Sequence, residues 1–366
     1  MKLDWIKRLL LRVFEGANVA VILLLWLAVA LTYLSPESFP RLSLLSLAFP
    51  VFLFTNLAFV AFWLIFKAKR VWIPIVGIAL CFSFVRDYCP VNLASEPADS
   101  SLTVISFNTH GFGGSEAADD EGNNLIVRYL ANRADDIICL QETYTPTHVQ
   151  ALSDSLSQRG YHEIRTKSLA CFTRLPVIDN DEIRFDSQSN SSLCAHLLWG
   201  TDTILLINNH FESNHFSPEM KQRYVDALEQ TANPNSRNIT PDSLIGDVKP
   251  LLHLLSEAAP KRAVQVNTID SIVNAWLPRP VILCGDFNDT PVSYTHRVLT
   301  RQLTSAFRQS GNGLGLTFRE QGFPVRIDHI LFSPQHWTSH TTRVDGDMTL
   351  SDHSPIYTVL SPKSNR

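Results

Sequence analysis

The first part of the chain contains three apolar runs. Residues 17–34 and 42–66 carry no charged side chain, and a shorter run at about 71–87 contains Pro74. The hydrocarbon core of a bilayer is about 30 Å thick and needs about 20 apolar helical residues to cross it. The pattern therefore predicts three membrane-spanning helices, the third of marginal length.

Two other interpretations of these runs are weaker. The basic leader Lys2, Lys7, Arg8 and Arg12 is typical of a signal peptide, but no small-residue cleavage site follows the first run. Core helices of a soluble domain would need a polar face toward water, which these runs lack. We therefore expect residues 1–96 to form an uncleaved membrane anchor.

The distribution of positive charge predicts the orientation of this anchor. The leader has four Lys or Arg residues, and Lys67, Lys69 and Arg70 separate the second and third runs, whereas Arg41 stands alone after the first. Positively charged loops stay in the cytoplasm, which places the N-terminus there. Three crossings would then put the rest of the chain outside the cytoplasm, in the periplasm if the membrane is the inner membrane of a bacterium. Without the third crossing, the rest of the chain would lie in the cytoplasm.

After a polar linker at 95–100 the pattern changes to short apolar runs separated by turn residues. Such runs are typical of strands, and residues 97–366 are predicted to form one α/β domain. The expected strands are 102–107, 137–140, 203–207, 281–284 and 327–332. The expected helices are 124–132, 220–231 and, more weakly, 250–259, with an exposed polar insertion at 233–247.

Composition separates the two parts further. Residues 1–96 have a net charge of +4, whereas the remainder has 22 basic against 30 acidic residues and all twelve histidines. No basic cluster typical of a nucleic-acid surface stands out. The six cysteines show no zinc-binding spacing, and pairing of Cys171 with Cys194 outside the cytoplasm is left open.

Polar residues follow the predicted strands at their carboxyl ends. In Asp286-Phe287-Asn288 the two polar side chains share one face, because side chains alternate along a strand. Carboxylates such as those of Glu142 and Asp352 are ligands that suit Mg²⁺ or Mn²⁺. An Asp within an apolar strand, Asp328, needs a partner when buried, and a histidine is a natural one.

These residues occur in an order that resembles the endonuclease/exonuclease/phosphatase superfamily over residues 100–362. The strings LQE, GDFN, RIDHIL and SDH carry the resemblance, together with Asn108 and His210. It implies a four-layer α/β sandwich, in which two packed mixed β-sheets are flanked by helices, here preceded by the three membrane helices. It also implies divalent-metal-dependent hydrolysis of phosphoesters, of phosphodiesterase or nuclease type.

The resemblance also assigns the metal and substrate contacts. Glu142 would hold Mg²⁺, with Mn²⁺ as the alternative, and Asn108 and Asp352 would be further ligands or orienting groups. Asn108, Asn288 and His210 would contact the substrate.

The same resemblance assigns the catalytic residues. Asp286 would position or deprotonate water, and Asn288 would bind a phosphate oxygen. His353, oriented by Asp328, would be a base or a charge stabiliser, and His210 would stabilise the transition state or protonate the leaving oxygen. The remaining histidines of the motifs, His110, His215 and His329, are interpreted as structural or peripheral.

The substrate stays open at this point among DNA, a phospholipid and a small phosphodiester. The acidic catalytic part and the anchor favour the latter two, because nucleases gain affinity from Lys and Arg contacts to phosphates. A catalytically inactive receptor or scaffold is the alternative of another class, and a transporter is disfavoured because the apolar runs lack ionisable residues. The anchor would contact the lipid bilayer, and no protein partner is predicted.

Overall fold

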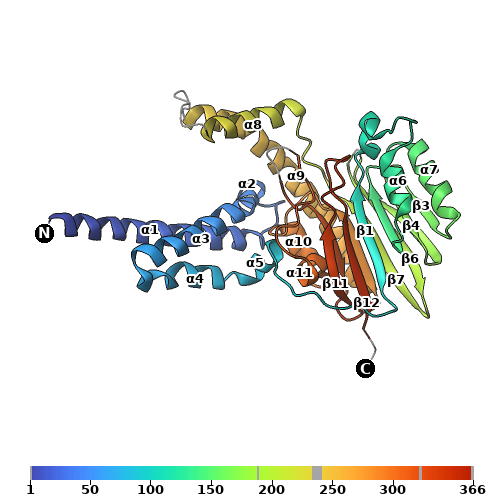
Figure 1. The fold of residues 1–366 in the computed structure, drawn as a ribbon, viewed down its shortest axis with the longest axis horizontal. Helices are drawn as coiled ribbons and strands as arrows, with labels where there is room; N and C mark the ends of the chain where they lie inside the picture. The colour runs from blue at the N-terminus through green and yellow to red at the C-terminus, as the bar shows by residue number, and fades with distance from the viewer. Residues whose placement is uncertain (1, 188, 233–240, 321–323, 364–366) are drawn as a thin grey trace.

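A computed structural model describes residues 2–187, 189–232, 241–320 and 324–363. A helical bundle projects from one side of a larger body that contains two β-sheets (Figure 1). The bundle consists of α1 (Lys2–Leu31), α2 (Pro40–Ser43), η1 (Leu44–Ala48), α3 (Phe49–Phe66), η2 (Ala68–Arg70), α4 (Trp72–Ala79) and α5 (Phe82–Tyr88).

Two helical segments are long and apolar enough to cross a membrane, Trp5–Leu31 and Pro40–Phe66. The prediction of a third continuous helix at 71–87 is wrong, because α4 and α5 meet at a bend of 71°. The break lies at Cys81. Its backbone leaves helical geometry, and its thiol lies 3.6 and 3.4 Å from the carbonyls of Gly77 and Ile78, which a continuous helix would use as acceptors.

Close contacts hold the bundle together along its length. At the end far from the sheets, Arg70 forms an ion pair of 2.8 Å with Glu15 and donates to the Leu11 carbonyl. Nearer the sheets, Gly77 allows α4 to approach α1, since a Cβ on this residue would lie 2.7 Å from Ile22. The chain therefore runs the length of the bundle a third time, through α4 and α5, before it enters the sheets.

The two sheets have six strands each among the described residues, in the orders β11-β12-β1-β2-β4-β3 and β5-β6-β7-β8-β10-β9. Both are mixed, because β1 pairs with β2 and β7 pairs with β8 in parallel, while the other pairs are antiparallel. The strands are β1 (Leu102–Asn108), β2 (Ile137–Gln141), β3 (His162–Arg165), β4 (Leu169–Thr173), β5 (Val177–Arg184), β6 (Ser191–Trp199), β7 (Asp202–His210), β8 (Val281–Asp286), β9 (Thr304–Ser305), β10 (Asp328–Phe332), β11 (Trp337–Val344) and β12 (Ile356–Pro362).

The strand pattern explains the layers. Alternate residues of both sheets, such as Val104 and Cys139 on one and Leu206 and Ile282 on the other, form the core between the sheets. The opposite faces are covered by helices, which gives the predicted α/β sandwich. The helices of this part are η3 (Gly111–Ala117), α6 (Leu125–Asn132), α7 (Pro146–Ser157), α8 (Pro218–Ala232), α9 (Pro241–Trp276), α10 (Tyr294–Leu299) and α11 (Ala306–Ser310).

The five predicted strands and the helices at 124–132 and 220–231 are confirmed. The more weakly predicted helix at 250–259 is also confirmed, but it is part of the longer α9, which continues through Pro250 and Pro260. Of the predicted insertion at 233–247, residues 233–240 lie outside the described residues, and 241–247 begin α9. The prolines and the polar composition do not predict a helix over 241–247. Packing of Val266 and Ile269 on the second sheet stabilises α9.

All six cysteines are free thiols. Cys171 lies on β4, opposite Cys139 of β2, and the two sulfur atoms are 3.9 Å apart. Cys194 belongs to the other sheet, where it packs on the outer face. The pairing of Cys171 with Cys194 is therefore not present in this structure.

Candidate active site

Strand register brings the predicted polar residues to one edge of the two sheets. The parallel pair β1 and β2 sets Asn108 opposite Gln141, directly before Glu142. In the other sheet, β8 ends at Asp286, which faces His210 of β7 on one side and Asp328 of β10 on the other. The strand ends of both sheets thus contribute to a single site.

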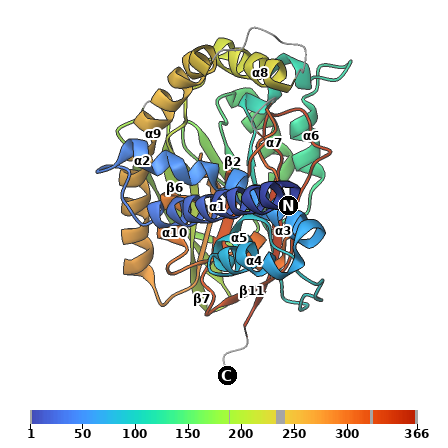
Figure 2. The same ribbon diagram turned by 90° about the vertical axis from the view of Figure 1, so that its left-hand side faces the viewer.

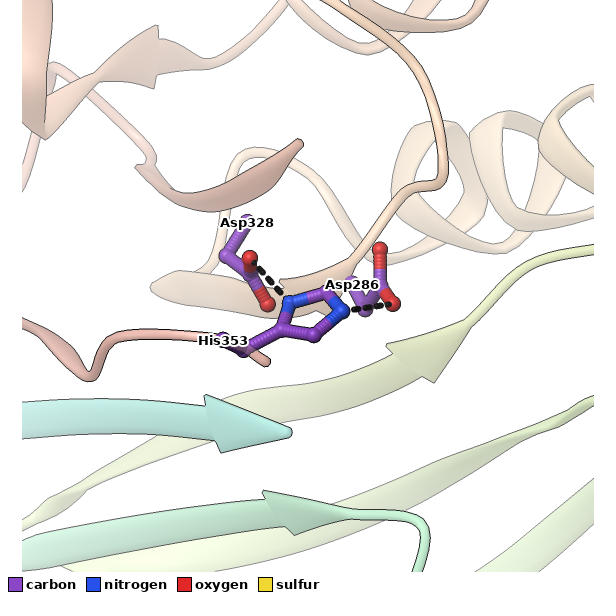
Figure 3. A group of neighbouring side chains, drawn as sticks. All are labelled: Asp286, Asp328 and His353. Carbon is purple, nitrogen blue, oxygen red and sulfur yellow. Dashed lines mark hydrogen bonds and ion pairs between the residues drawn. The ribbon is translucent and has the colours of Figure 1, made fainter. Parts of the chain in front are cut away.

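His353 lies between the carboxylates of two strands (Figure 3). Its Nδ1 atom is 2.8 Å from Oδ2 of Asp328, and its Nε2 atom is 3.7 Å from Oδ2 of Asp286. All three side chains are buried. This arrangement fixes the imidazole, with one carboxylate on each ring nitrogen.

Burial and charge change the acidity of this group of residues. Burial opposes the charged form of His353, but Asp328 and Asp286 outweigh it and raise its pKa to about 10. Burial and the Asp328 charge raise the pKa of Asp286 to about 7. At neutral pH the histidine is therefore an imidazolium ion, and the Asp286 carboxyl gains and loses a proton in the physiological range.

A turn around Thr317 supports the pair of Asp328 and His353. The Thr317 hydroxyl accepts hydrogen bonds of 3.1 Å from the backbone N–H groups of Ile327 and Asp328. The next residue, Phe318, places its ring 5.0 Å from the His353 ring. These contacts fix the backbone at Asp328 and the position of the His353 ring.

Asn108 connects the two sheets at the site. Its amide nitrogen donates to Oε1 of Glu142 at 3.1 Å and to Oδ2 of Asp286 at 3.0 Å. Its amide oxygen accepts from the backbone N–H of His110. Asn108 thus orients both carboxylates, and its oxygen, as placed, faces away from them.

Glu142 and Asp352 lie at the mouth of the site, with His110 between them. Nδ1 of His110 is 3.3 Å from Oδ1 of Asp352 and 3.9 Å from Oε2 of Glu142. The hydrogen bond to Asp352 raises the pKa of His110. Burial opposes the ionisation of Asp352, but His110 and the charge on His353 bring its pKa below the usual range.

His110 was missed as a site residue by sequence reasoning. Its ring is 62% exposed, and its backbone is left-handed at φ 46°, which turns it toward the carboxylates. The available signal was its position two residues after Asn108, in the loop that leaves the strand. His329 is buried, with Nε2 3.1 Å from the Asp289 carbonyl, and His215 lies 3.5 Å from Glu212.

Two groups of side chains could hold a divalent cation. Glu142 and Asp352 offer carboxylate oxygens around the point that the His110 nitrogen now approaches, and such hard oxygen donors fit Mg²⁺. In the second group Asp286, Asp328 and His353 each offer a ligand atom, all within 4.8 Å of one another. We favour the first group, because the His353 of the second group is protonated at neutral pH, so its ring nitrogens have no free lone pair for a metal and its charge repels a cation.

His210 and Asn288 complete the site on the side of the second sheet. Nε2 of His210 lies 3.6 Å from Glu142 and 3.8 Å from Asp286, and burial lowers the pKa of this histidine, which keeps it neutral. Within the described part of the chain its Nδ1 atom has no hydrogen-bond partner. Asn288, at φ 51°, donates from its side chain to the Phe211 carbonyl and from its backbone to Asp286.

Comparison with known proteins bears on the family and the fold. A family model described as the endonuclease/exonuclease/phosphatase family matches residues 105–353, and one described as a domain of unknown function matches residues 10–88. Similar solved structures include the human Nocturnin catalytic domain with bound sulfate, at 16% identity and a TM-score of 0.51, covering 74% of this chain and 96% of that one. Another is D. rerio TDP2 with a single-strand DNA product, at 18% identity and a TM-score of 0.50, covering 72% of this chain and 100% of that one. These two likenesses show the fold. No curated protein matches this sequence significantly.

Proposed function

Because the chain belongs to the endonuclease/exonuclease/phosphatase family, we propose that it is a divalent-metal-dependent phosphoester hydrolase of phosphodiesterase or nuclease type. The arrangement of Asp328, His353 and Asp286 beside Glu142 is the observation that supports this activity most strongly. The site combines Asp286 as a base, the His353 imidazolium as a fixed positive charge, and the carboxylates of Glu142 and Asp352 at its mouth. A phospholipid or small phosphodiester is the alternative to a nucleic-acid substrate.

The chain's own residues divide the chemistry between them. Asp286 accepts a proton from the attacking water, since a pKa of about 7 suits a base at neutral pH. The His353 imidazolium, held by Asp328, stabilises negative charge that grows on the phosphate oxygens. Asn288 and the neutral His210 bind phosphate oxygens, and His210 protonates the leaving oxygen, whereas both amide hydrogens of Asn108 are already donated to Glu142 and Asp286.

Glu142 and Asp352 would hold the metal ion, which supplies positive charge to a phosphate oxygen when bound. Mg²⁺ is the expected ion, and Mn²⁺ is the alternative. In this proposal Asn108 acts as the orienting group rather than as a ligand, because its amide nitrogen faces both carboxylates.

We further propose that residues 1–96 anchor the enzyme in a membrane and that residues 97–366 form the catalytic domain. The two apolar helical segments and the return of the chain through α4 and α5 support this division. With the N-terminus in the cytoplasm and the bent pair α4 and α5 as the third crossing, the catalytic domain would lie outside the cytoplasm, in the periplasm of a bacterium.

The test uses the full chain in detergent micelles with bis(p-nitrophenyl) phosphate as substrate. We expect turnover with Mg²⁺ or Mn²⁺ and none with a chelator. Asp286→Asn should lower kcat by about 10²–10⁴-fold, whereas Asp202→Asn, at an exposed position of β7, should leave it unchanged. Turnover that persists in chelator would show that the reaction needs no metal ion. Normal turnover by Asp286→Asn would show that Asp286 is not the base.

A further inference from the structure

The helical bundle packs against the loop that follows the catalytic residues of β8. Val292, four residues after Asn288, is fully buried in one apolar cluster with Leu25 and Ala28 of α1 and Phe49 of α3. On the next helix, Arg297 of α10 stacks on the Tyr33 ring at 3.3 Å from its centroid. The active-site loop therefore takes part in the core of the bundle.

A second contact joins the bundle to α11. Arg308 donates to the backbone and side-chain oxygens of Ser83 at 3.1 Å, and pairs with Asp87 at 2.5 Å. Asn92, just after α5, donates to the carbonyls of Arg308 and Gly311. Because these hydrogen bonds involve both α5 and the residues directly after it, the chain that leaves the bundle is fixed to α11 rather than free.

A third contact reaches the other side of the active site. Arg326, two residues before Asp328, is 4% exposed and donates to the Asp87 and Tyr88 carbonyls at the end of α5. A positive charge at a helix C-terminus is favourable because the last carbonyls lack partners within the helix. The bundle thus contacts the chain both after Asp286 and before Asp328.

These contacts limit the distance between the site and the bilayer. A chain step covers at most about 3.6 Å, so the Cα atoms of Asn288 and Val292 lie within roughly 14 Å of each other. In α1, charged residues are absent from Gly16 to the helix end at Leu31, a helical length of about 24 Å, and the following turn adds none before Glu37. This uncharged stretch therefore approaches the thickness of the hydrocarbon core. Asp289 and Ser293, on either side of Val292, line a cavity together with Leu31 and Pro36 near the Glu37 end of this stretch, so the site lies at the level of the lipid headgroups.

Exposed apolar side chains surround the junction between bundle and sheets. Figure 2, viewed from the bundle side, shows α1 pointing toward the viewer with the sheets behind it. The segments that join the two parts expose a set that we call the junction collar: Tyr33, Leu34, Phe39, Leu42, Phe82 and Val91. The collar continues the apolar surface of α1 and α3, and a bilayer around these helices would cover it.

We infer that the bundle fixes the active site at the bilayer surface and that the substrate is a phospholipid in the same membrane. The inference rests on the proposed phosphoester hydrolysis and names its substrate class. Water adds to phosphorus, the bond from phosphorus to one alcohol oxygen breaks, and the alcohol leaves with a proton. The net charge of −8 in the catalytic part agrees with a substrate that is delivered by the membrane rather than attracted as a polyanion.

The experiment compares substrate in the same membrane with substrate in another. The full chain is reconstituted in phosphatidylethanolamine and phosphatidylglycerol vesicles that contain a headgroup-labelled phosphatidylethanolamine. In the second arm the labelled lipid is placed in separate protein-free vesicles. Cleavage of either P–O ester bond on the headgroup side or the glycerol side releases the dye into water. We expect release at least tenfold faster in the first arm.

Arg308→Met tests the role of the docked bundle, with Arg301→Met as the matched control. Arg301 pairs with Asp270 at 2.9 Å on the outer surface and does not contact the bundle in the described structure. We expect Arg308→Met to lower lipid cleavage by at least tenfold while turnover of bis(p-nitrophenyl) phosphate stays within twofold. Arg301→Met should change neither rate.

The outcomes separate this inference from the proposed function. Equal dye release in the two vesicle arms would overturn the inference, and so would cleavage of plasmid DNA or bis(p-nitrophenyl) phosphate without any lipid cleavage. In both cases phosphoester hydrolysis would stand. Failure on every substrate with Mg²⁺ and Mn²⁺ present, by a chain that retains its melting transition, would overturn the proposed function and the inference together.

Discussion

Oδ2 of Asp328 lies 2.8 Å from Nδ1 of His353 and determines which ring nitrogen faces Asp286. The bond is buried, so the attraction between the carboxylate and the imidazolium is only weakly screened by water. Because Asp286 and Asp328 are paired directly across β8 and β10, the position of the imidazole is set by strand register rather than by a flexible loop alone.

Replacement of Asp328 by Asn removes the charge that holds the imidazolium while the side-chain volume stays almost unchanged. We expect Asp328→Asn to lower kcat for bis(p-nitrophenyl) phosphate by about 10²–10⁴-fold, with a smaller change in KM. Steady-state kinetics of the full chain in detergent measures this. The exposed Asp179→Asn on β5 serves as the control. An unchanged kcat in Asp328→Asn would contradict a catalytic role for the pair.

The stability of the metal-free protein should depend on pH through His353. Its pKa is raised from 6.5 to about 10, so the folded chain holds a proton that the unfolded chain releases. This stabilisation is complete below pH 6.5 and is lost as pH rises toward 10, with a slope of at most about 1.4 kcal/mol per pH unit.

Thermal unfolding in detergent and chelator between pH 6.5 and 9.5 measures this effect. Tm should fall with rising pH, and His353→Gln should flatten the curve. His253→Gln, at an exposed position of α9, should keep the slope of the unaltered chain. The linkage assigned to His353 would be wrong if both variants gave the same curve.

The orienting role of Asn108 predicts an effect on metal binding. Asn108→Ala removes the donor that holds the Glu142 and Asp286 carboxylates in place. Loss of such a partner typically lowers metal affinity by about 10–100-fold. Calorimetric titration with Mn²⁺ measures it, with the exposed Asn180→Ala as the control. Unaltered affinity in Asn108→Ala would place the cation elsewhere, for example at Asp286, Asp328 and His353.

Gly285 of β8 leaves no room for a Cβ beside the backbone of β7. It has φ 135°, and a Cβ there would lie 2.0 Å from the Asn209 carbonyl oxygen. We expect Gly285→Ala to destabilise the fold by at least about 1–3 kcal/mol and to lower Tm by more than about 3 °C. Gly346→Ala, which meets no atom within 4 Å, should melt normally. Equal melting of the two variants would show that the strands can separate to accept a methyl group.

The strand ends were predictable from sequence because strand pairing brings them together. Asn108 and Glu142 follow neighbouring parallel strands, and His210 and Asp286 follow another such pair. The metal-site geometry was less accessible, because the place of His110 depends on a left-handed backbone that composition does not reveal.

The errors in the predicted helices have local causes. The break between α4 and α5 lies at Cys81, whose backbone leaves helical geometry, and an apolar run carries no sign of it. The length of α9 depends on tertiary packing that outweighs Pro250 and Pro260. Hydropathy therefore identified which segments are apolar, while the side-chain contacts decided where the helices end.

The contact between Arg326 and the end of α5 bears on how this protein could evolve. One part of the gene encodes the Arg326 guanidinium, and the other encodes the Asp87 and Tyr88 carbonyls to which it donates. A recombination break in the linker would separate these partners and leave a buried cation with the Leu314 carbonyl but without its two acceptors at the end of α5. The two gene segments should therefore be inherited as one unit rather than exchanged between relatives as independent modules.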